Sequence, residues 1–142
     1  MKVGLIGSGN VATVLGRLLL QNNHTVTQVI SRELSHAKNL AAELNAYSDD
    51  FSGKPDISAD VFIIAVADSA LLGCIDHFDM GNKLVVHTAG SVAMDVLKSV
   101  SANYGVLYPL QSLRKEMTGF PAIPFLVDGN TPDVTEFIRV FA

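Results

Sequence analysis

The sequence predicts an α/β fold, a doubly wound and mostly parallel sheet with helices on both faces. Short apolar runs alternate with segments of helical spacing, and these runs lack the in-and-out pattern of half-exposed strands. Continuous apolar runs are typical of parallel strands that are covered on both faces. The alternation of strand and helix implies right-handed crossovers. A chain of 142 residues is long enough for one such domain.

The predicted strands are short, and four of them are rich in valine and isoleucine. They comprise residues 2–6, 25–30, 61–67, 84–87, 106–108 and 124–127. A further short strand is expected near Ala46 and Tyr47, whereas the polar and turn-rich stretch 48–58 is typical of a loop.

Three predicted helices lie between these strands, and each has an apolar face. The faces comprise Val11, Val14, Leu15, Leu18 and Leu19; Leu34, Ala37, Leu40, Ala41 and Leu44; and Leu71, Cys74, Ile75 and Phe78. Spacings of three and four residues place each set on one side of a helix, where it can pack against the sheet.

Residues 131–142 predict a terminal helix. Thr131 is a typical N-cap, Pro132 suits the first helical position, and Asp133 places an acid near the positive end of the helix dipole. Apolar residues then follow at helical spacing up to Ala142, without a Gly, Asn or Pro to end the helix. One interpretation is a short terminal helix. We favour a second one, in which residues 1–142 are the N-terminal part of a longer protein.

Composition excludes several classes of function. The longest apolar run, residues 61–67, is far shorter than the roughly 20 residues of a membrane-spanning helix. The net charge is −4, and no basic run exists beyond Arg114 and Lys115, which argues against binding to nucleic acid or to a membrane surface. A single cysteine, Cys74, forms neither an internal disulfide nor a structural zinc site. We therefore expect a cytoplasmic protein without a metal.

The strongest motif is a glycine-rich turn between the first predicted strand and the first predicted helix. It reads Gly7-Ser8-Gly9-Asn10-Val11-Ala12, the GxGxxA form of the dinucleotide-binding fingerprint. Gly7 permits the tight turn, Gly9 lets the backbone approach a pyrophosphate, and Ala12 lets the helix pack closely on the strand. Unpaired N–H groups at the helix start favour the anion. The alternative is a glycine turn without a ligand.

The end of the second strand indicates which dinucleotide binds. A site for NAD normally has an acidic residue here, which binds the ribose 2′-hydroxyl. This chain has Ser31 and Arg32, a hydroxyl and a guanidinium that suit a 2′-phosphate. We therefore favour NADP over NAD. Glu33 keeps NAD open if the strand ends late, and an ordinary surface arginine is the third possibility.

The strand at residues 61–67 is expected to deliver further contacts, because ligands of open α/β sheets bind outside the carboxyl ends of the strands. Ala65, Val66 and Ala67 are candidates for the wall beside the ribose or nicotinamide. Asp68 follows them directly. Its more ordinary role is to cap the next helix, and a contact with the cofactor is the alternative.

Candidate catalytic residues follow the next two strands. Hydride transfer to a carbonyl or imine requires a proton donor or polarising group near the reacting carbon. His87, Thr88 and Ser91 end one strand, and Tyr108 and Gln111 end the other. We predict His87, Ser91 and Tyr108 as catalytic candidates, with His87 and Thr88 also near the cofactor. The alternatives are that Ser91 is a helix N-cap, that His87 ties loops together, and that Tyr108 and Gln111 form a loop rim.

These motifs together resemble the NADP-binding domain of the 6-phosphogluconate-dehydrogenase-like superfamily. The similarity is greatest to a poorly characterised group of oxidoreductases with a helical C-terminal domain. The matching pieces are residues 7–12, 31–32, 66–68, 87–91 and 108–112, in the same order. This resemblance implies a Rossmann domain over residues 1–142, with a C-terminal domain that supplies a homodimer interface and half of the substrate pocket. The chain departs from the group at Ala67, where proline is usual, and at Ala89, where serine is common.

Two functions follow from the sequence. The first is an NADP-dependent oxidoreductase that transfers hydride between the nicotinamide and a small carbonyl, imine or hydroxy compound. The second is a dinucleotide-binding sensor or interaction module without turnover. Both predict the same contacts with the cofactor, and they differ in whether the full-length protein consumes NADPH with a small-molecule substrate.

Overall fold

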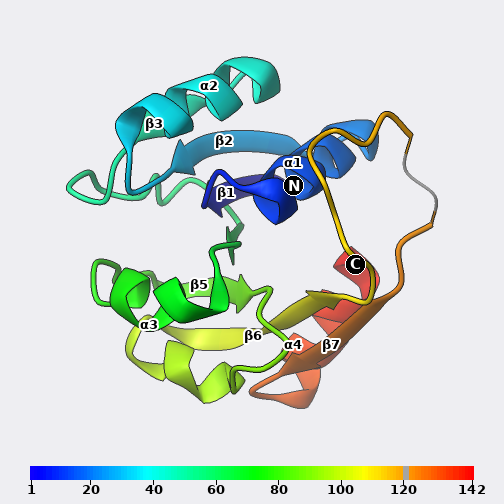
Figure 1. Cartoon of the computed structure of the whole chain (residues 1–142). Coiled ribbons are helices and arrows are strands. Elements are labelled where there is room, and N and C mark those ends of the chain that lie inside the picture. The colour runs from blue at the N-terminus through cyan, green and yellow to red at the C-terminus, as the bar shows by residue number, and fades with distance from the viewer. Residues whose placement is uncertain (120–121) are drawn as a thin grey trace.

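A computed structural model describes residues 1–119 and 122–142 as an α/β domain around a seven-stranded sheet (Figure 1). The strands are β1 (Lys2–Ile6), β2 (Thr25–Ile30), β3 (Tyr47–Asp49), β4 (Val61–Ile64), β5 (Gly81–His87), β6 (Ser101–Pro109) and β7 (Phe125–Gly129). Their order across the sheet is β3-β2-β1-β4-β5-β6-β7. All neighbouring pairs are parallel except β6 and β7, which are antiparallel. The predicted doubly wound, mostly parallel sheet is confirmed.

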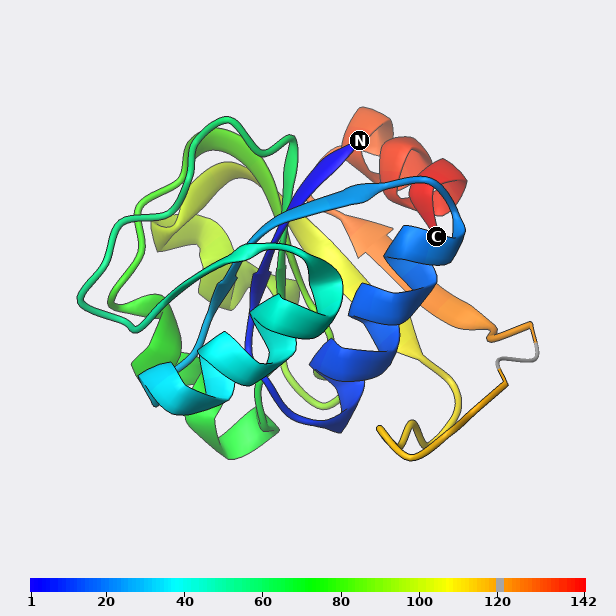
Figure 2. The ribbon, with the colours of Figure 1, turned by 90° about the horizontal axis from the view of Figure 1, so that it is seen from above.

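Helices cover both faces of this sheet (Figure 2). They are α1 (Asn10–Gln21), α2 (Leu34–Leu44), α3 (Asp68–Ile75), the 3₁₀ helix η1 (Met94–Ser99) and α4 (Pro132–Phe141). Helices α1, α2 and α4 pack on one face, and α3 and η1 pack on the other. The order of the strands reverses between β1 and β4, because β2 and β3 follow on one side of β1 and the later strands on the other. Open α/β sheets bind their ligands at such a point.

The central strands are apolar throughout because successive side chains enter different cores. In β4, Val61 and Ile63 pack under α1 and α2, whereas Phe62 and Ile64 pack under α3 and η1. All four are at most 1% exposed. A strand that is buried on both faces has no solvent side, so its sequence shows no alternation.

Some boundaries differ from the predicted ones. Strand β4 ends at Ile64, and residues 65–67 lead into α3 without extending the strand. The short strand expected near Tyr47 is present as β3. The alternative interpretation of Ser91 as a helix N-cap is wrong, because η1 begins at Met94 with Ala93 as its N-cap.

The capping role of Asp68 is also wrong. Ala67 occupies the N-cap position of α3 without a side-chain hydrogen bond, and Asp68 is the first helical residue. The Ser91 hydroxyl instead donates to Asp68 Oδ2 at 2.6 Å. These two side chains therefore bind each other across the carboxyl edge of the sheet, and neither caps a helix.

Helix α4 begins as predicted. Thr131 Oγ1 accepts a hydrogen bond from the Val134 backbone N–H at 3.2 Å, and Pro132 occupies the first turn. Ile138 is fully buried against the sheet, whereas Val140 is 69% exposed. No helix among residues 1–119 and 122–142 combines the length and apolar character needed to cross a membrane.

Candidate dinucleotide and substrate site

The glycine turn after β1 has the geometry that the fingerprint predicts. Gly7 has a φ of 120°, a conformation that side chains other than glycine rarely adopt. A Cβ atom at Gly7 would also overlap the carbonyl oxygen of Ala65. The Gly7 N–H donates to the Ile30 carbonyl at 2.8 Å, which fixes the turn at the carboxyl end of β2.

The N-terminus of α1 forms an open cradle next to this turn. Gly9 is the N-cap residue, and a Cβ atom built on it would meet no other atom within 4 Å. No side chain caps the helix, and its first turn carries no acidic residue. Ala12 is fully buried, so α1 lies close to the sheet. Unpaired N–H groups, the helix dipole and open space together fit a pyrophosphate.

A cavity of about 210 Å³ lies on the β2 side of this cradle. It is lined by Gly7, Ser8, Gly9, Ser31, Arg32, Phe51, Ala65, Val66, Ala67, Ala70 and Cys74. The Ser8 and Ser31 hydroxyls are 2.8 Å apart and hydrogen-bonded. The structure thus brings together the glycine turn, the β2 tip and residues 65–67, as the sequence predicts. We call this space the Arg32 cavity.

Arg32 lines this cavity, whereas the neighbouring Glu33 does not. Strand β2 ends at Ile30, so Arg32 follows the strand closely and lines the cavity. Glu33 is the N-cap residue of α2 and is not among the lining residues. The ion pairs among the described residues are Arg17–Glu43 and Arg139–Glu136, so the Arg32 guanidinium is available to an anion. This geometry suits a 2′-phosphate.

Sequence reasoning missed three residues of the Arg32 cavity, Phe51, Ala70 and Cys74. Phe51 lies in the turn-rich stretch after β3, where a single aromatic residue carries no periodic signal. Cys74 was correctly predicted as a core residue and is 3% exposed. Burial raises the pKa of its thiol to about 11, and the positive charge of Arg32 opposes this shift. Cys74 therefore lines the cavity with a thiol that is uncharged at neutral pH.

A second cavity, of about 490 Å³, lies on the β5–β6 side of α1. It is lined by Val11, Asp68, Thr88, Gly90, Ser91, Tyr108, Pro109, Leu110, Gln111, Ser112 and Leu113. Asp68 is the one charged residue among these. The Tyr108 ring lies against the backbone of Gly90, with its atoms 2.6–2.8 Å from the place that a Cβ would occupy. We call this space the Tyr108 cavity.

His87 lies outside both cavities. It is fully buried at the end of β5, where its Nδ1 accepts a hydrogen bond from the Ala89 N–H at 3.0 Å. Its Nε2 therefore carries the proton and lies 3.3 Å from the Ala93 carbonyl oxygen. Burial lowers the pKa of His87, which favours the neutral ring. Both nitrogens are engaged by backbone groups, an arrangement that ties together residues 87–93.

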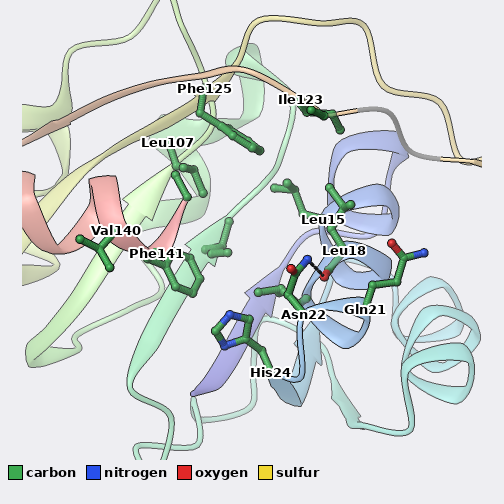
Figure 3. A pocket seen from close by; sticks show the side chains of 14 residues that line it. Leu15, Leu18, Gln21, Asn22, His24, Leu107, Ile123, Phe125, Val140 and Phe141 are labelled. Atoms are coloured by element: carbon green, nitrogen blue, oxygen red, sulfur yellow. Dashed lines mark hydrogen bonds between the residues drawn. The ribbon is translucent and has the colours of Figure 1, made fainter.

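A third cavity, of about 630 Å³, lies away from the Arg32 and Tyr108 cavities (Figure 3). It lies between α1, α4 and the start of β7, and its lining combines apolar side chains with polar ones, namely Gln21, Asn22 and His24. His24 at its rim has its ring 5.4 Å from that of Phe141, and burial lowers the pKa of His24. None of its lining residues belongs to the fingerprint or to the other two cavities.

The described residues show no metal site. Within residues 1–119 and 122–142, no three His, Cys, Asp or Glu side chains gather closely enough to hold an ion.

Comparisons with solved structures agree with this architecture. A Bacteroides fragilis protein assigned by name to the NADP oxidoreductases is 30% identical, with a TM-score of 0.82 over 98% of this chain and 55% of its own. A 1-pyrroline-5-carboxylate reductase from Streptococcus pyogenes is 16% identical, with a TM-score of 0.71 over 99% and 54%. An imine reductase from Aspergillus terreus is 18% identical, with a TM-score of 0.70 over 97% and 51%.

The chain thus spans about half the length of these proteins. The curated protein sequences contain no match. The family model described as NADP oxidoreductase, coenzyme F420-dependent, matches residues 2–91. This range includes the glycine turn, the end of β2 and those residues of the Tyr108 cavity that precede Val92. The chain therefore belongs to this family of NADP oxidoreductases, and it is an NADP-binding oxidoreductase domain with a Rossmann-like fold.

Proposed function

We propose that the complete protein transfers hydride between NADP and a small carbonyl, imine or hydroxy compound that binds in the Tyr108 cavity. The observation that carries this proposal is the placement of two cavities on either side of the α1 N-terminus. One contains an available guanidinium, and the other is lined by several polar side chains, among them Asp68, Ser91 and Tyr108. A dinucleotide with its pyrophosphate at α1 has room for one end in each cavity.

In this proposal the cofactor contacts come from four segments. The residues are Gly7, Ser8, Gly9, Asn10, Val11 and Ala12 around the pyrophosphate; Ser31 and Arg32 at the 2′-phosphate; Ala65, Val66, Ala67 and Asp68 along the ribose wall; and Thr88 beside the nicotinamide. His87 contributes indirectly, because its ring holds the backbone that carries Thr88.

The nicotinamide supplies the hydride, and the chain has to supply the proton that a carbonyl oxygen needs. Ser91 already donates its hydroxyl proton to Asp68. Its oxygen is therefore left as an acceptor that can orient a substrate N–H or O–H group. Thr88, Tyr108 and Ser112 are the other hydroxyl side chains that line this cavity. A phenol is a stronger acid than an aliphatic alcohol, so we assign the proton transfer to Tyr108.

We also propose that this domain is followed by a helical domain that completes the substrate pocket and forms a homodimer in the cytoplasm. The solved relatives are about twice as long as this chain, which supports the second domain. Exposed apolar residues on α4, Phe137 and Val140, offer a surface for it. The buried, free thiol of Cys74 suits a reducing compartment.

The proposal is tested in two stages. Fluorescence titration of the 142-residue chain should show saturable binding of NADPH, and a chain without such binding would contradict the cofactor assignment. The longer protein should then oxidise NADPH when small carbonyl and imine compounds are supplied. Binding without oxidation across such a panel would instead favour a non-catalytic module.

A further inference from the structure

The segment between β6 and β7 passes beside the start of α1 (Figure 2, gold beside the blue helix). Residues 110–119 of this segment, which we call the strap, are fixed to α1 at one residue, Lys115. The Lys115 backbone N–H donates to Asn10 Oδ1 at 3.0 Å. The Lys115 carbonyl oxygen accepts a hydrogen bond from Arg17 Nη1. Both bonds span about a hundred residues of sequence, so they belong to the tertiary structure.

A bidentate ion pair fixes the direction of Arg17. Its Nε is 2.7 Å from Glu43 Oε2, and its Nη2 is 2.8 Å from Glu43 Oε1. This contact raises the pKa of Arg17 and lowers that of Glu43. The remaining Nη1 then points at the strap. Asn10, Arg17 and Glu43 therefore form a latch, which we define by these three residues.

The strap touches both parts of the proposed site. Leu110 to Leu113 form one wall of the Tyr108 cavity, and Leu113 is 6% exposed. Asn10 is the first residue of α1, at the cradle beside Gly9. The side chain that anchors the strap thus belongs to the same residue whose backbone N–H faces the pyrophosphate position.

The latch also controls where two cations lie. Arg114 and Lys115 are exposed, and the latched strap holds the Lys115 backbone within hydrogen-bond distance of Asn10. Lysine carries its ammonium group on a flexible four-carbon stem, so the Lys115 charge is free to approach the α1 N-terminus from this position. An anionic dinucleotide consequently binds the latched strap more tightly than a released one. Such a difference in affinity is what a ligand needs to shift a conformational equilibrium.

We propose that the strap is a coupling element, in which dinucleotide binding at α1 closes the latch and thereby sets the strap wall of the substrate cavity. This inference rests on the proposed cofactor site. Because coupling between two binding events is reciprocal, a weaker latch must also weaken dinucleotide binding. Arg17 and Glu43 are positioning residues here, since they act through Lys115 and line neither the Arg32 nor the Tyr108 cavity.

Limited proteolysis with trypsin measures the strap directly, because trypsin cleaves after Arg114 and Lys115. Cleavage at these two bonds is followed by mass spectrometry at several NADP⁺ concentrations. We expect saturating NADP⁺ to slow cleavage at least fivefold, with the same midpoint as binding measured by calorimetry. NADP⁺ that binds without slowing cleavage would overturn the coupling and leave the cofactor site intact. Absence of binding would overturn both.

The variant Arg17→Met removes the latch about two helical turns from the cradle. We expect faster cleavage at the strap without cofactor, by about threefold or more, and an NADP⁺ dissociation constant raised by about threefold. Arg139→Met is the matched control, because Arg139 forms a comparable ion pair with Glu136 on α4. It should change neither quantity, and an Arg17→Met protein that equals this control would contradict the proposal.

The variant Lys115→Met separates the charge from the latch, since both latch bonds at this position use backbone atoms. It should weaken NADP⁺ binding in a salt-dependent way, while cleavage after Arg114 without cofactor stays at the wild-type rate. Unchanged affinity at low salt would refute the electrostatic origin of the coupling. Thermal unfolding of each variant is measured in parallel, so that loss of fold is distinguished from loss of the latch.

Discussion

The Arg32 cavity and the Tyr108 cavity flank the same helix terminus, yet they are built differently. The first is formed by short stretches of chain that follow strands directly, and its defining features are backbone conformation and a single guanidinium. The second is formed by side chains from the ends of β4, β5 and β6 and from the strap. Its polar groups bind one another, as Ser91 and Asp68 do.

This difference explains why the first cavity follows a general dinucleotide-binding motif, whereas the second depends on side chains that are particular to this chain. A turn with a positive φ and an uncapped helix recognises any pyrophosphate, so a few residues at fixed spacing suffice. A substrate cavity depends on where side chains from distant segments meet. Blocking the cradle should strongly weaken cofactor binding, whereas removal of the Tyr108 hydroxyl should spare binding and affect turnover.

Tyr108→Phe tests the second cavity and should have the largest effect. Removal of the proton donor should lower turnover of the complete enzyme by roughly 10²–10⁴-fold, with little change in NADPH affinity. Steady-state kinetics and a binding titration measure the two quantities. His87→Ala is the comparison, and it should instead destabilise the fold, because the Ala89 N–H and the Ala93 carbonyl lose their partners. Loss of turnover in a stably folded His87→Ala protein, with Tyr108→Phe near normal, would return the proton transfer to His87.

Gly9→Val tests the cradle of the first cavity. Gly9 has a φ of −84°, which valine tolerates, and its Cβ position is open. The domain should therefore fold, while the side chain occupies the pyrophosphate space and weakens NADPH binding by about 10²-fold or more. Gly73→Val is a matched control, because Gly73 also faces open space but lies in α3. Circular dichroism and calorimetry give the result, and a folded Gly9→Val protein with normal affinity would move the site elsewhere.

The pH dependence of stability tests whether the Cys74 thiol, which lines the first cavity, is buried and uncharged. Burial raises the pKa of its thiol from 9.0 to about 11, so the folded state favours the neutral thiol. The resulting stability is fully present below pH 9 and is lost as the pH rises from 9 to 11. A shift of this size corresponds to about 2–3 kcal/mol in the free energy of unfolding. Urea denaturation across this range should show the decline, and Cys74→Ala should lack that part of it. Identical slopes in both proteins would mean that the thiol is accessible to water.

Arg32→Ala should have the smallest effect, which concerns only the choice of cofactor. A charge-assisted pair contributes about 1.5–3 kcal/mol, so the preference for NADPH over NADH should fall by about tenfold or more. Titration of both nucleotides into the two proteins measures this ratio. Arg139→Ala, in which the altered arginine lies on α4 and lines neither cavity, is the control. An unchanged ratio in Arg32→Ala would assign the 2′-phosphate to another group.

Much of the fold and half of the site were predictable because they depend on local rules. The apolar runs gave the strands, the Thr131-Pro132-Asp133 pattern gave the start of α4, and the glycine turn gave the cradle. The predictions for Ser91 and Asp68 as helix caps failed for a common reason. Each residue suits an N-cap by type, but a partner 23 residues away offered a hydrogen bond at 2.6 Å. Local propensity is weak enough for such a contact to override it.

The sequence by itself determined the doubly wound sheet, the dinucleotide cradle and the position of Arg32 after β2. The sheet and Arg32 depend on short-range spacing, and the cradle depends also on the conformational freedom of glycine. Only the tertiary structure decided that His87 is buried and locked by backbone groups, while Tyr108, Ser91 and Asp68 face a common cavity. It also decided that Lys115 meets Asn10 across the chain. Which side chain reaches a cavity depends on the packing of distant segments, and no local pattern encodes that arrangement.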